Sequence, residues 1–598
     1  MSAPTPHARG RWRLGALLRV SLSAVAVAGA AAALSSCAGC GSSRDGFDLP
    51  DASGAVKPDA GGALTEGGAK TACELAAARR SPLGCDYSVF AFPEATFFKL
   101  CTALIVSNPG TQPARLSIRY DGKALAIGPS ARRITGTGRD PGWVPLDDDL
   151  LAPGGSAVIN IVDGVRSWTG SGPCAFPALK DELAFVIDGT GSAFQLHADQ
   201  PILATFRSGY GVAGGYGQGT ASATLRAVPS WSAQYLDVGV YMPGRTTAQV
   251  WKEVPTGTFV VPDGAFAAFV AAEPTSVTVV TDAGSETYRL KTGEIYRLFR
   301  DDLHIGSIIT ADHPFGLFAG VPLAFIPYNV PWGNQILTQV APTDSWASEY
   351  AAVGHPPRRT DRDDPSLFRI VAAKNGTAFV YDPSPPSGAP ASLDAGGLAV
   401  FGSSTPFVVR SQDAEHPFYV SVSMTGSGPL CDIQRFNDQP WDGGSPGDIK
   451  TTNCPGGPSL IGIPRPLEYA QSFAFSTDYQ FADTSLVLVR KKVGDRFADV
   501  RLDCAGTLSG WMPVGNGGVY ETATIPLSRG NFAPQVYPGG SCQLGAHTMA
   551  SDAPFTAFVW GGTHKGVDGT DPDTYAEPGM VSYGYALYGI EGPARPTR

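Results

Sequence analysis

The sequence is poor in charged residues and in helical patterning. Only 16% of its 598 residues are charged while 43% are apolar, so the chain can bury large hydrophobic cores. Its net charge is -10 and no basic stripe runs along the body, which argues against a nucleic-acid partner. After Cys37, no apolar run approaches the roughly 20 residues of a membrane-spanning helix. We therefore expect a body without a membrane-spanning helix and without nucleic acid.

Catalytic and metal-binding motifs are also scarce. The body contains neither a C-x-x-C pair nor H-E-x-x-H, the spacings that would indicate zinc. Gly443-Gly444-Ser445-Pro446-Gly447 matches G-x-S-x-G, but a nucleophile elbow needs a strand before the Ser and a helix after it. Asp568, Asp571 and Asp573 could collect Ca²⁺, although a solvated acidic loop explains them more simply. We expect no enzyme, no catalytic residue, no cofactor and no metal.

The N-terminus has the pattern of a lipoprotein signal peptide. A basic start up to Arg19 precedes an apolar stretch from Val20 to Leu34, too short to span a bilayer. The stretch ends in Leu34-Ser35-Ser36-Cys37, which resembles the bacterial lipobox. We expect lipidation of Cys37 after removal of residues 1–36; the alternative is a conventional signal peptide cut near Ala33. Several acyl chains on one Cys would make a firm membrane anchor, and Ala38 favours the outer membrane or cell surface.

Residues 37–72 read as a disordered tether, rich in Gly, Ser, Asp, Ala and Pro. They contain too little apolar surface to offset the entropy of ordering. A flexible chain of this length would hold the body roughly 30–35 Å from the bilayer on average.

Export makes disulfides chemically possible for the ten Cys of the chain. Without Cys37 and Cys40, the candidates are Cys73, Cys85, Cys101, Cys174, Cys431, Cys454, Cys504 and Cys542. Cys431 with Cys454 and Cys504 with Cys542 would close local loops, and we prefer that pairing. The early four can pair in three ways, which stay open here.

The body alternates β-branched or aromatic residues with polar ones, and its 73 Gly and 50 Pro indicate many turns between short strands. An acidic-x-Pro-apolar step recurs at Asp199-Gln200-Pro201-Ile202, Asp312-His313-Pro314-Phe315, Glu415-His416-Pro417-Phe418 and Asp552-Ala553-Pro554-Phe555. The acidic residue is expected to end one strand, and Pro to open the next. His313 and His416 share one place in this step, which favours a structural role, and His547 reads as a polar residue beside a turn.

Four copies of the step predict an all-β fold of tandem antiparallel β-sandwich-like repeats. The predicted modules are 73–230, 231–342, 343–455 and 456–598. About 100 residues and six or seven strands per module suit a sandwich better than a propeller blade. Closure into a β-propeller-like arrangement is the alternative.

Several short motifs follow one another along the body. They are Phe318-Ala319-Gly320, Gln339-Val340-Ala341-Pro342, Trp346-Ala347-Ser348-Glu349-Tyr350, Phe368-Arg369-Ile370-Val371-Ala372, Asn375-Gly376-Thr377, Gly456-Gly457-Pro458-Ser459-Leu460 and Ser582-Tyr583-Gly584-Tyr585. In this order they resemble the N-terminal domain of the IgGFc-binding protein family and its bacterial relatives. The resemblance spans roughly residues 73 to 592. It departs at Asn375, where the family has Asp, and the sequence contains none of the family's cysteine-rich modules. The resemblance implies a binding or adhesive β-domain and brings no catalytic residues.

Aromatic residues in loop-like sequence are the candidate contacts with a partner. They are Trp332, Trp441, Tyr210 and Tyr216; Tyr and Trp in loops commonly anchor partners. The sequence thus predicts a cell-envelope lipoprotein with a binding or adhesion surface for an extracellular or surface glycoprotein or glycan. The alternative is a secreted, glycosidase-like hydrolase, which would need two facing carboxylates that sequence cannot identify.

Overall fold

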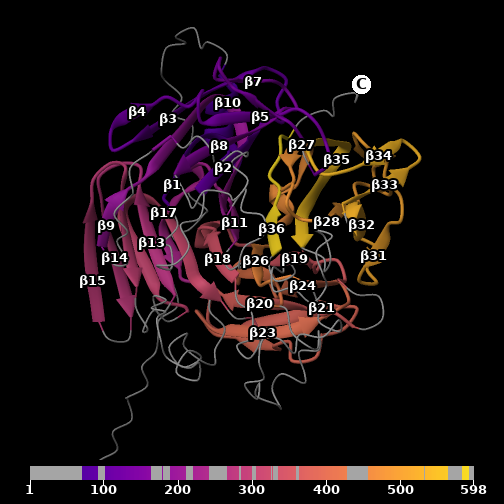
Figure 1. Ribbon diagram of the computed structural model, residues 1–598. Helices are drawn as coiled ribbons and strands as arrows, with labels where there is room; N and C mark the ends of the chain where they lie inside the picture. Colours follow the sequence, from indigo (N-terminus) through magenta and orange to yellow (C-terminus); the bar gives the residue numbers. More distant parts are fainter. Residues whose placement is uncertain are drawn as a thin grey trace, which may run out of the picture. The chain divides into compact units, whose positions relative to one another are not determined.

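Four sets of strands with one common order make up the computed structural model of the chain (Figure 1). We call each set a repeat. The structure describes residues 70–91, 102–139, 141–162, 178–179, 189–209, 220–240, 265–281, 284–299, 305–324, 326, 334–358, 363–426, 456–530, 532–562 and 582–591. All of them belong to one compact unit.

Repeat 1 follows the short helix α1 (Ala72–Ala78), which starts at a capping box between Thr71 and Glu74. Its seven common strands are β1 (Gly84–Val89), β2 (Thr102–Ser107), β3 (Ala114–Tyr120), β4 (Lys123–Leu125), β8 (Ser156–Val162), β10 (Phe194–Ser208) and β11 (Ala221–Thr224). The additional strands are β5 (Ala131–Ile134), β6 (Trp143–Pro145), β7 (Leu150–Leu151) and β9 (Gly189–Ser192).

The other repeats follow the same order. Repeat 2 contains β12 (Ser232–Leu236), β13 (Phe266–Ala271), β14 (Thr275–Thr281), β15 (Gly284–Leu290), β16 (Glu294–Phe299), β17 (Ile308–Ala324) and β18 (Asn334–Gln339). Repeat 3 contains β19 (Glu349–Ala352), β20 (Ser366–Ala372), β21 (Thr377–Asp382), β22 (Ser392–Leu393), β23 (Leu398–Ser403), a sixth strand split into β24 (Phe407–Ser411) and β25 (Phe418–Met424), and β26 (Ser459–Gly462). Repeat 4 contains β27 (Ala470–Ser476), β28 (Asp483–Lys491), β29 (Val500–Leu502), β30 (Gly506–Thr507), β32 (Tyr520–Arg529), β35 (Ala546–Gly562) and β36 (Ser582–Ala586), with β31 (Met512–Val514), β33 (Ala533–Tyr537) and β34 (Gly540–Cys542) added.

Each repeat is antiparallel: repeats 1, 2 and 4 each form one continuous sheet, and repeat 3 forms two. The two sheets of repeat 3 are four-stranded, in the orders β19-β24-β21-β22 and β23-β20-β25-β26. One hydrophobic core holds residues of both, among them Tyr350 and Val409 from the first sheet and Phe368 and Val420 from the second. A sandwich packs this way, whereas a propeller blade is a single sheet. The predicted all-β fold is confirmed.

The acidic-x-Pro step marks the point where the sixth strand exchanges one set of partner strands for another. Residues 194–198 of β10 pair with β3, whereas residues 203–208 pair with β2. The strands β17 and β35 change partners at the same place. The expected strand break occurs only in repeat 3, between β24 and β25; elsewhere the strand continues through the step. In repeats 1, 2 and 4 a long strand with two sets of partners therefore links both sets into one continuous sheet.

In repeats 1 and 2, the acid of the step bonds a backbone amide, but on another strand. Asp199 Oδ1 accepts from the Arg115 N–H on β3, and Asp312 Oδ1 accepts from the Ser276 N–H on β14, each at 2.7 Å. In these two repeats the acid thereby fastens the start of the third strand and does not end its own.

Two strands pair with a repeat other than the one to which the predicted module boundaries assign them. The strand β9 belongs to the predicted first module but pairs with β16 of repeat 2. The strand β26 follows the boundary at residue 455 but pairs with β25 of repeat 3. The Gly- and Pro-rich segment 427–455 looks like a linker in sequence, yet it joins two strands of one sheet.

Short 3-10 helices connect consecutive repeats: η2 (Val228–Ser230), η3 (Thr343–Ser345) and η5 (Pro466–Glu468). A Trp follows each of the first two and caps the preceding chain. Trp231 Nε1 donates to the Arg226 carbonyl at 3.1 Å, and Trp346 Nε1 donates to the Ala341 carbonyl at 3.0 Å. The same connection thus leads from the last strand of one repeat into the first strand of the next.

Candidate functional site

The last strands of the four repeats, β11, β18, β26 and β36, contact one another, and Figure 1 shows their labels gathered together. We call this group the junction. β11 contacts both β18 and β36, and β26 also contacts both. Repeats 1 and 4 are therefore direct neighbours, although the chain connects them only through repeats 2 and 3.

A row of hydroxyl groups joins β11 to β36. Thr220 Oγ1 donates to the Ser582 carbonyl at 2.9 Å, and Ser222 Oγ donates to the Gly584 carbonyl at 2.7 Å. Thr224 Oγ1 donates to the Ala586 carbonyl in the same register. Residues two apart share one face of a strand, so the three hydroxyls lie in line. Among the described residues β36 pairs only with β35, and the hydroxyl row satisfies carbonyls on its other edge.

One buried side chain ties all four repeats together at the start of the junction strands. Asn334, the first residue of β18, is fully buried. Its Oδ1 accepts from the Thr220 N–H at 2.7 Å. Its Nδ2 donates to the carbonyls of Pro458 and Ser582, each at 3.0 Å. Repeats 1, 3 and 4 thus all form hydrogen bonds to the same side-chain amide of repeat 2, that of Asn334.

The four segments that precede these residues occupy the same place in their repeats, between the sixth and the last strand. The predicted binding residues Tyr210 and Tyr216 belong to the segment before Thr220, Trp332 to the one before Asn334, and Trp441 to the one before Pro458. All four aromatic residues lie outside the described residues. Their segments nevertheless lead into one hydrogen-bonded cluster.

A small cavity lies at the other end of the junction strands. Its volume is about 40 Å³, and Arg226, Gln339, Arg465, Glu468 and Tyr588 are among its lining residues. Pockets for drug-sized ligands occupy roughly 300–1,000 Å³, so the cavity can take only something very small.

An ion pair crosses this cavity from repeat 1 to the η5 connection. Arg226 Nη2 donates to Glu468 Oε1 at 2.7 Å, and Arg226 Nη1 donates to the Tyr588 hydroxyl at 3.0 Å. The side chains of Arg226 and Glu468 are 4% and 7% exposed. Burial raises the pKa of Tyr588 to about 12, against the opposing effect of Arg226, so this hydroxyl stays neutral.

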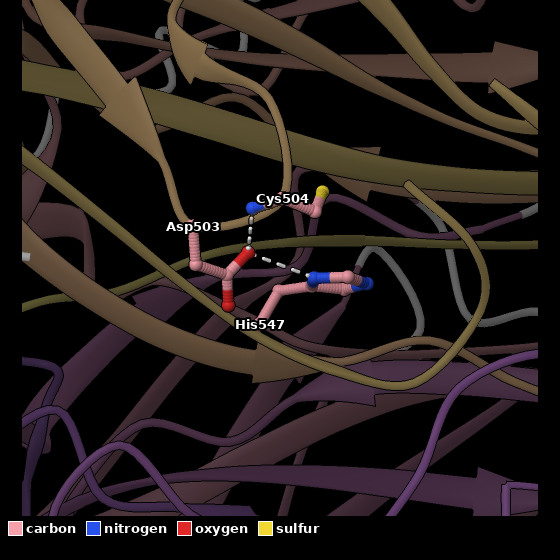
Figure 2. A group of neighbouring side chains, drawn as sticks. All are labelled: Asp503, Cys504 and His547. Atoms are coloured by element: carbon pink, nitrogen blue, oxygen red, sulfur yellow. Dashed lines mark hydrogen bonds and ion pairs between the residues drawn. The ribbon is translucent and has the colours of Figure 1, made fainter. Parts of the chain in front are cut away.

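Asp503, Cys504 and His547 form a second cluster, on β35 and the turn after β29 (Figure 2). Asp503 Oδ1 accepts from the Cys504 N–H at 2.7 Å and lies 3.0 Å from His547 Nδ1. His547 Nε2 lies 2.8 Å from the Gln543 carbonyl, so both ring nitrogens have partners. Cys504 is bonded to Cys542, and its sulfur is therefore no thiolate for a metal or a substrate. The cluster braces the β29 turn against β35.

Two disulfides are present among the described residues. Cys504 pairs with Cys542, as local loop closure predicts, and Cys73 pairs with Cys85, one of the pairings left open for the early four. The predicted Cys431–Cys454 pair, Cys101, Cys174 and the lipidation site Cys37 lie outside the described residues. So do the G-x-S-x-G string at 443–447 and the acidic residues at 568–573.

Sequence reasoning missed the polar groups of the junction and misplaced one His. His547 is buried within β35 rather than beside a turn. The alternation through Ala546-His547-Thr548-Met549 could have placed it in a strand. Arg226 and Glu468 are 242 residues apart, and no local pattern reveals such a pair.

A comparison of the sequence with known protein families gives a match over most of the β-repeats. Residues 225–561, more than half of the chain, match the family described as IgGFc binding protein. The match covers repeats 2 and 3 and most of repeat 4, whereas the motifs suggested a likeness starting near residue 73. No curated protein and no solved structure matched the chain. On the strength of the family match over its β-repeats, this chain belongs to the IgGFc-binding protein family.

Proposed function

We propose that this protein is an exported, lipid-anchored component of the cell envelope whose β-repeats bind an extracellular macromolecule. The basic start, the short apolar stretch and Leu34-Ser35-Ser36-Cys37 support the lipid anchor. No helix among the described residues has the length and apolarity needed to cross a bilayer. The proposed contact with the membrane is the lipid on Cys37, and the proposed location is the outer membrane or cell surface.

The proposed partner is an extracellular or surface glycoprotein or glycan. The family description names a protein that binds the Fc part of IgG, and Fc is accordingly one candidate among extracellular proteins. The proposal favours binding over catalysis for two reasons. The described Asp503 cluster has no free thiol, and the Gly and Pro residues around Ser445 do not have the sequence pattern of a strand followed by a helix.

The observation that carries the proposal is the convergence of equivalent segments at Asn334. Tyr216 lies four residues before Thr220, and Trp332 lies two residues before Asn334. Thr220 and Asn334 are hydrogen-bonded to each other. The described ends of segments from different repeats therefore meet at one place on a rigid scaffold, which suits a composite binding surface.

A glycan and protein array that includes IgG Fc, probed with the purified protein beside a broad hydrolase panel, tests the proposal. Trp332→Ala and Trp441→Ala should each weaken binding by roughly 2–4 kcal/mol if the residue is a hot spot, with little change in melting temperature. Val536→Ala is the control, because Val536 is 84% exposed on the β33 hairpin and lies on none of these segments. Turnover of a glycan, ester or peptide without stable binding to any array member would favour the hydrolase alternative and refute the proposal.

A further inference from the structure

Three of the described hydrogen-bond donors that line the cavity at the junction have no partner. Among the described residues, Arg226 Nε, Gln339 Nε2 and Arg465 Nε are buried and have no hydrogen-bond partner. The Arg226 side chain is 4% exposed and Gln339 is 7% exposed. All three residues line the cavity. Buried polar atoms are rarely left unpaired, because each lost hydrogen bond costs about 1–3 kcal/mol.

The cavity also carries an excess of positive charge. Two guanidinium groups, on Arg226 and Arg465, face one carboxylate, on Glu468. Arg465 Nε lies 3.7 Å from Glu468 Oε1, close enough for an ion pair but too far for a hydrogen bond. Glu468 is already engaged by Arg226 and by the backbone N–H of Arg465. Two guanidinium groups thus share one carboxylate, and although the Arg465 side chain is 25% exposed, its Nε is buried. Burying charge that is not fully paired is costly.

We propose that this cavity binds a small inorganic anion of the size of chloride. An anion accepts from several N–H donors at once and supplies the missing negative charge. About 40 Å³ accommodates a monatomic ion or two to three waters, at roughly 10–15 Å³ per water, but no sugar or peptide group. The site is distinct from the Asn334 cluster, which lies at the other end of the junction strands.

The anion would act as a structural ligand of the junction. Arg226 comes from repeat 1, Gln339 from repeat 2, Glu468 from the connection between repeats 3 and 4, and Tyr588 from the chain after β36. A ligand that binds only the assembled junction stabilises it by mass action. The melting temperature should therefore depend on the identity of the anion and not only on ionic strength.

Thermal unfolding of the full-length protein in sodium chloride and in sodium gluconate, at one fixed ionic strength, tests this. Gluconate is too large for the cavity, and constant ionic strength keeps screening equal. Chloride should raise the melting temperature saturably, by roughly 1–3 °C. Crystals soaked in bromide should show an anomalous peak between Arg226 Nε and Gln339 Nε2.

Gln339→Glu is the matched variant. It keeps the acceptor for the backbone N–H of Arg226, which donates to Gln339 Oε1 at 2.7 Å. It also places the missing negative charge in the cavity. The chloride-dependent rise should disappear in this variant and persist in Gln412→Glu, which changes an exposed Gln. If Gln339→Glu does not fold, Arg465→Met removes the excess charge and should abolish the rise as well. Equal melting temperatures in the two salts, with only water at the cavity after the bromide soak, would overturn the proposal.

Discussion

Replacing Asn334 by Ala should destabilise the protein by about 3–5 kcal/mol. The change leaves two buried groups without this partner, the Thr220 N–H and the Pro458 carbonyl. It also removes one of the two hydrogen bonds of the Ser582 carbonyl, which still accepts from Thr220 Oγ1. Each hydrogen bond contributes about 1 kcal/mol net, and each unpaired buried group costs about 1–3 kcal/mol, while relaxation recovers part of the sum. Because the three partners belong to repeats 1, 3 and 4, the loss should appear as weaker cohesion between repeats.

The assay is urea unfolding followed by tryptophan fluorescence and by limited proteolysis. Asn334→Asp is the informative second variant, because it keeps the acceptor for Thr220 but turns both donor bonds into contacts between oxygen atoms. It should cost at least as much as Asn334→Ala at neutral pH. Asn375→Ala is the control, since Asn375 is exposed and accepts from the Ala395 N–H at the surface. A loss below about 1 kcal/mol for both Asn334 variants would refute the idea that this amide holds the repeats together.

Three further outcomes are expected. Replacing Cys504 and Cys542 together by Ala should cost about 4 kcal/mol in denaturant unfolding, since their separation of 38 residues closes a long loop; an unchanged midpoint would contradict this. Burial raises the pKa of Asp364, but His355 and Arg358 outweigh it and lower that pKa to about 2. The ionised carboxylate therefore stabilises the folded state above about pH 4, and this stabilisation is lost as the pH falls toward 2. In Asp364→Asn, the free energy of unfolding should fall by about 2–3 kcal/mol less between pH 4 and pH 2 than in the unmodified protein. The same fall in both proteins would contradict this. Cys37→Ala should release the protein from membranes in cell fractionation; retention after a carbonate wash would reject the lipid anchor.

The sequence predicts the strand repeat well, because its signal is local. Period-two alternation and the acidic-x-Pro step depend on a few neighbouring residues, and both recur in each repeat. The step's function was not predictable in the same way. Whether a strand ends at Pro201 or continues with new partners depends on strands such as β2 and β3, which come from earlier in the chain.

The junction could not be predicted from the sequence for a related reason. In sequence, Thr220, Ser222 and Thr224 look like the solvent face of an alternating strand. Their partners lie 362 residues later, and β36 turns that polar face into an interface. Polar residues at such interfaces carry the same pattern as exposed ones, so the distinction requires the tertiary arrangement.

The contact of β11 with β36 also determines when the junction can be completed during synthesis of the chain. The ribosome makes the chain from its N-terminus at about 5–20 residues per second, so the partner of Thr220 is made roughly 20–70 s after Thr220 itself. During that interval the hydroxyl groups of β11 lack their acceptors on β36, whereas β18 and β26, which also contact β11, are already made. Residues 582–591 complete the junction. A chain cut short before residue 582 would lack the carbonyl that Thr220 and Asn334 bond, and the junction should then be more open to proteases.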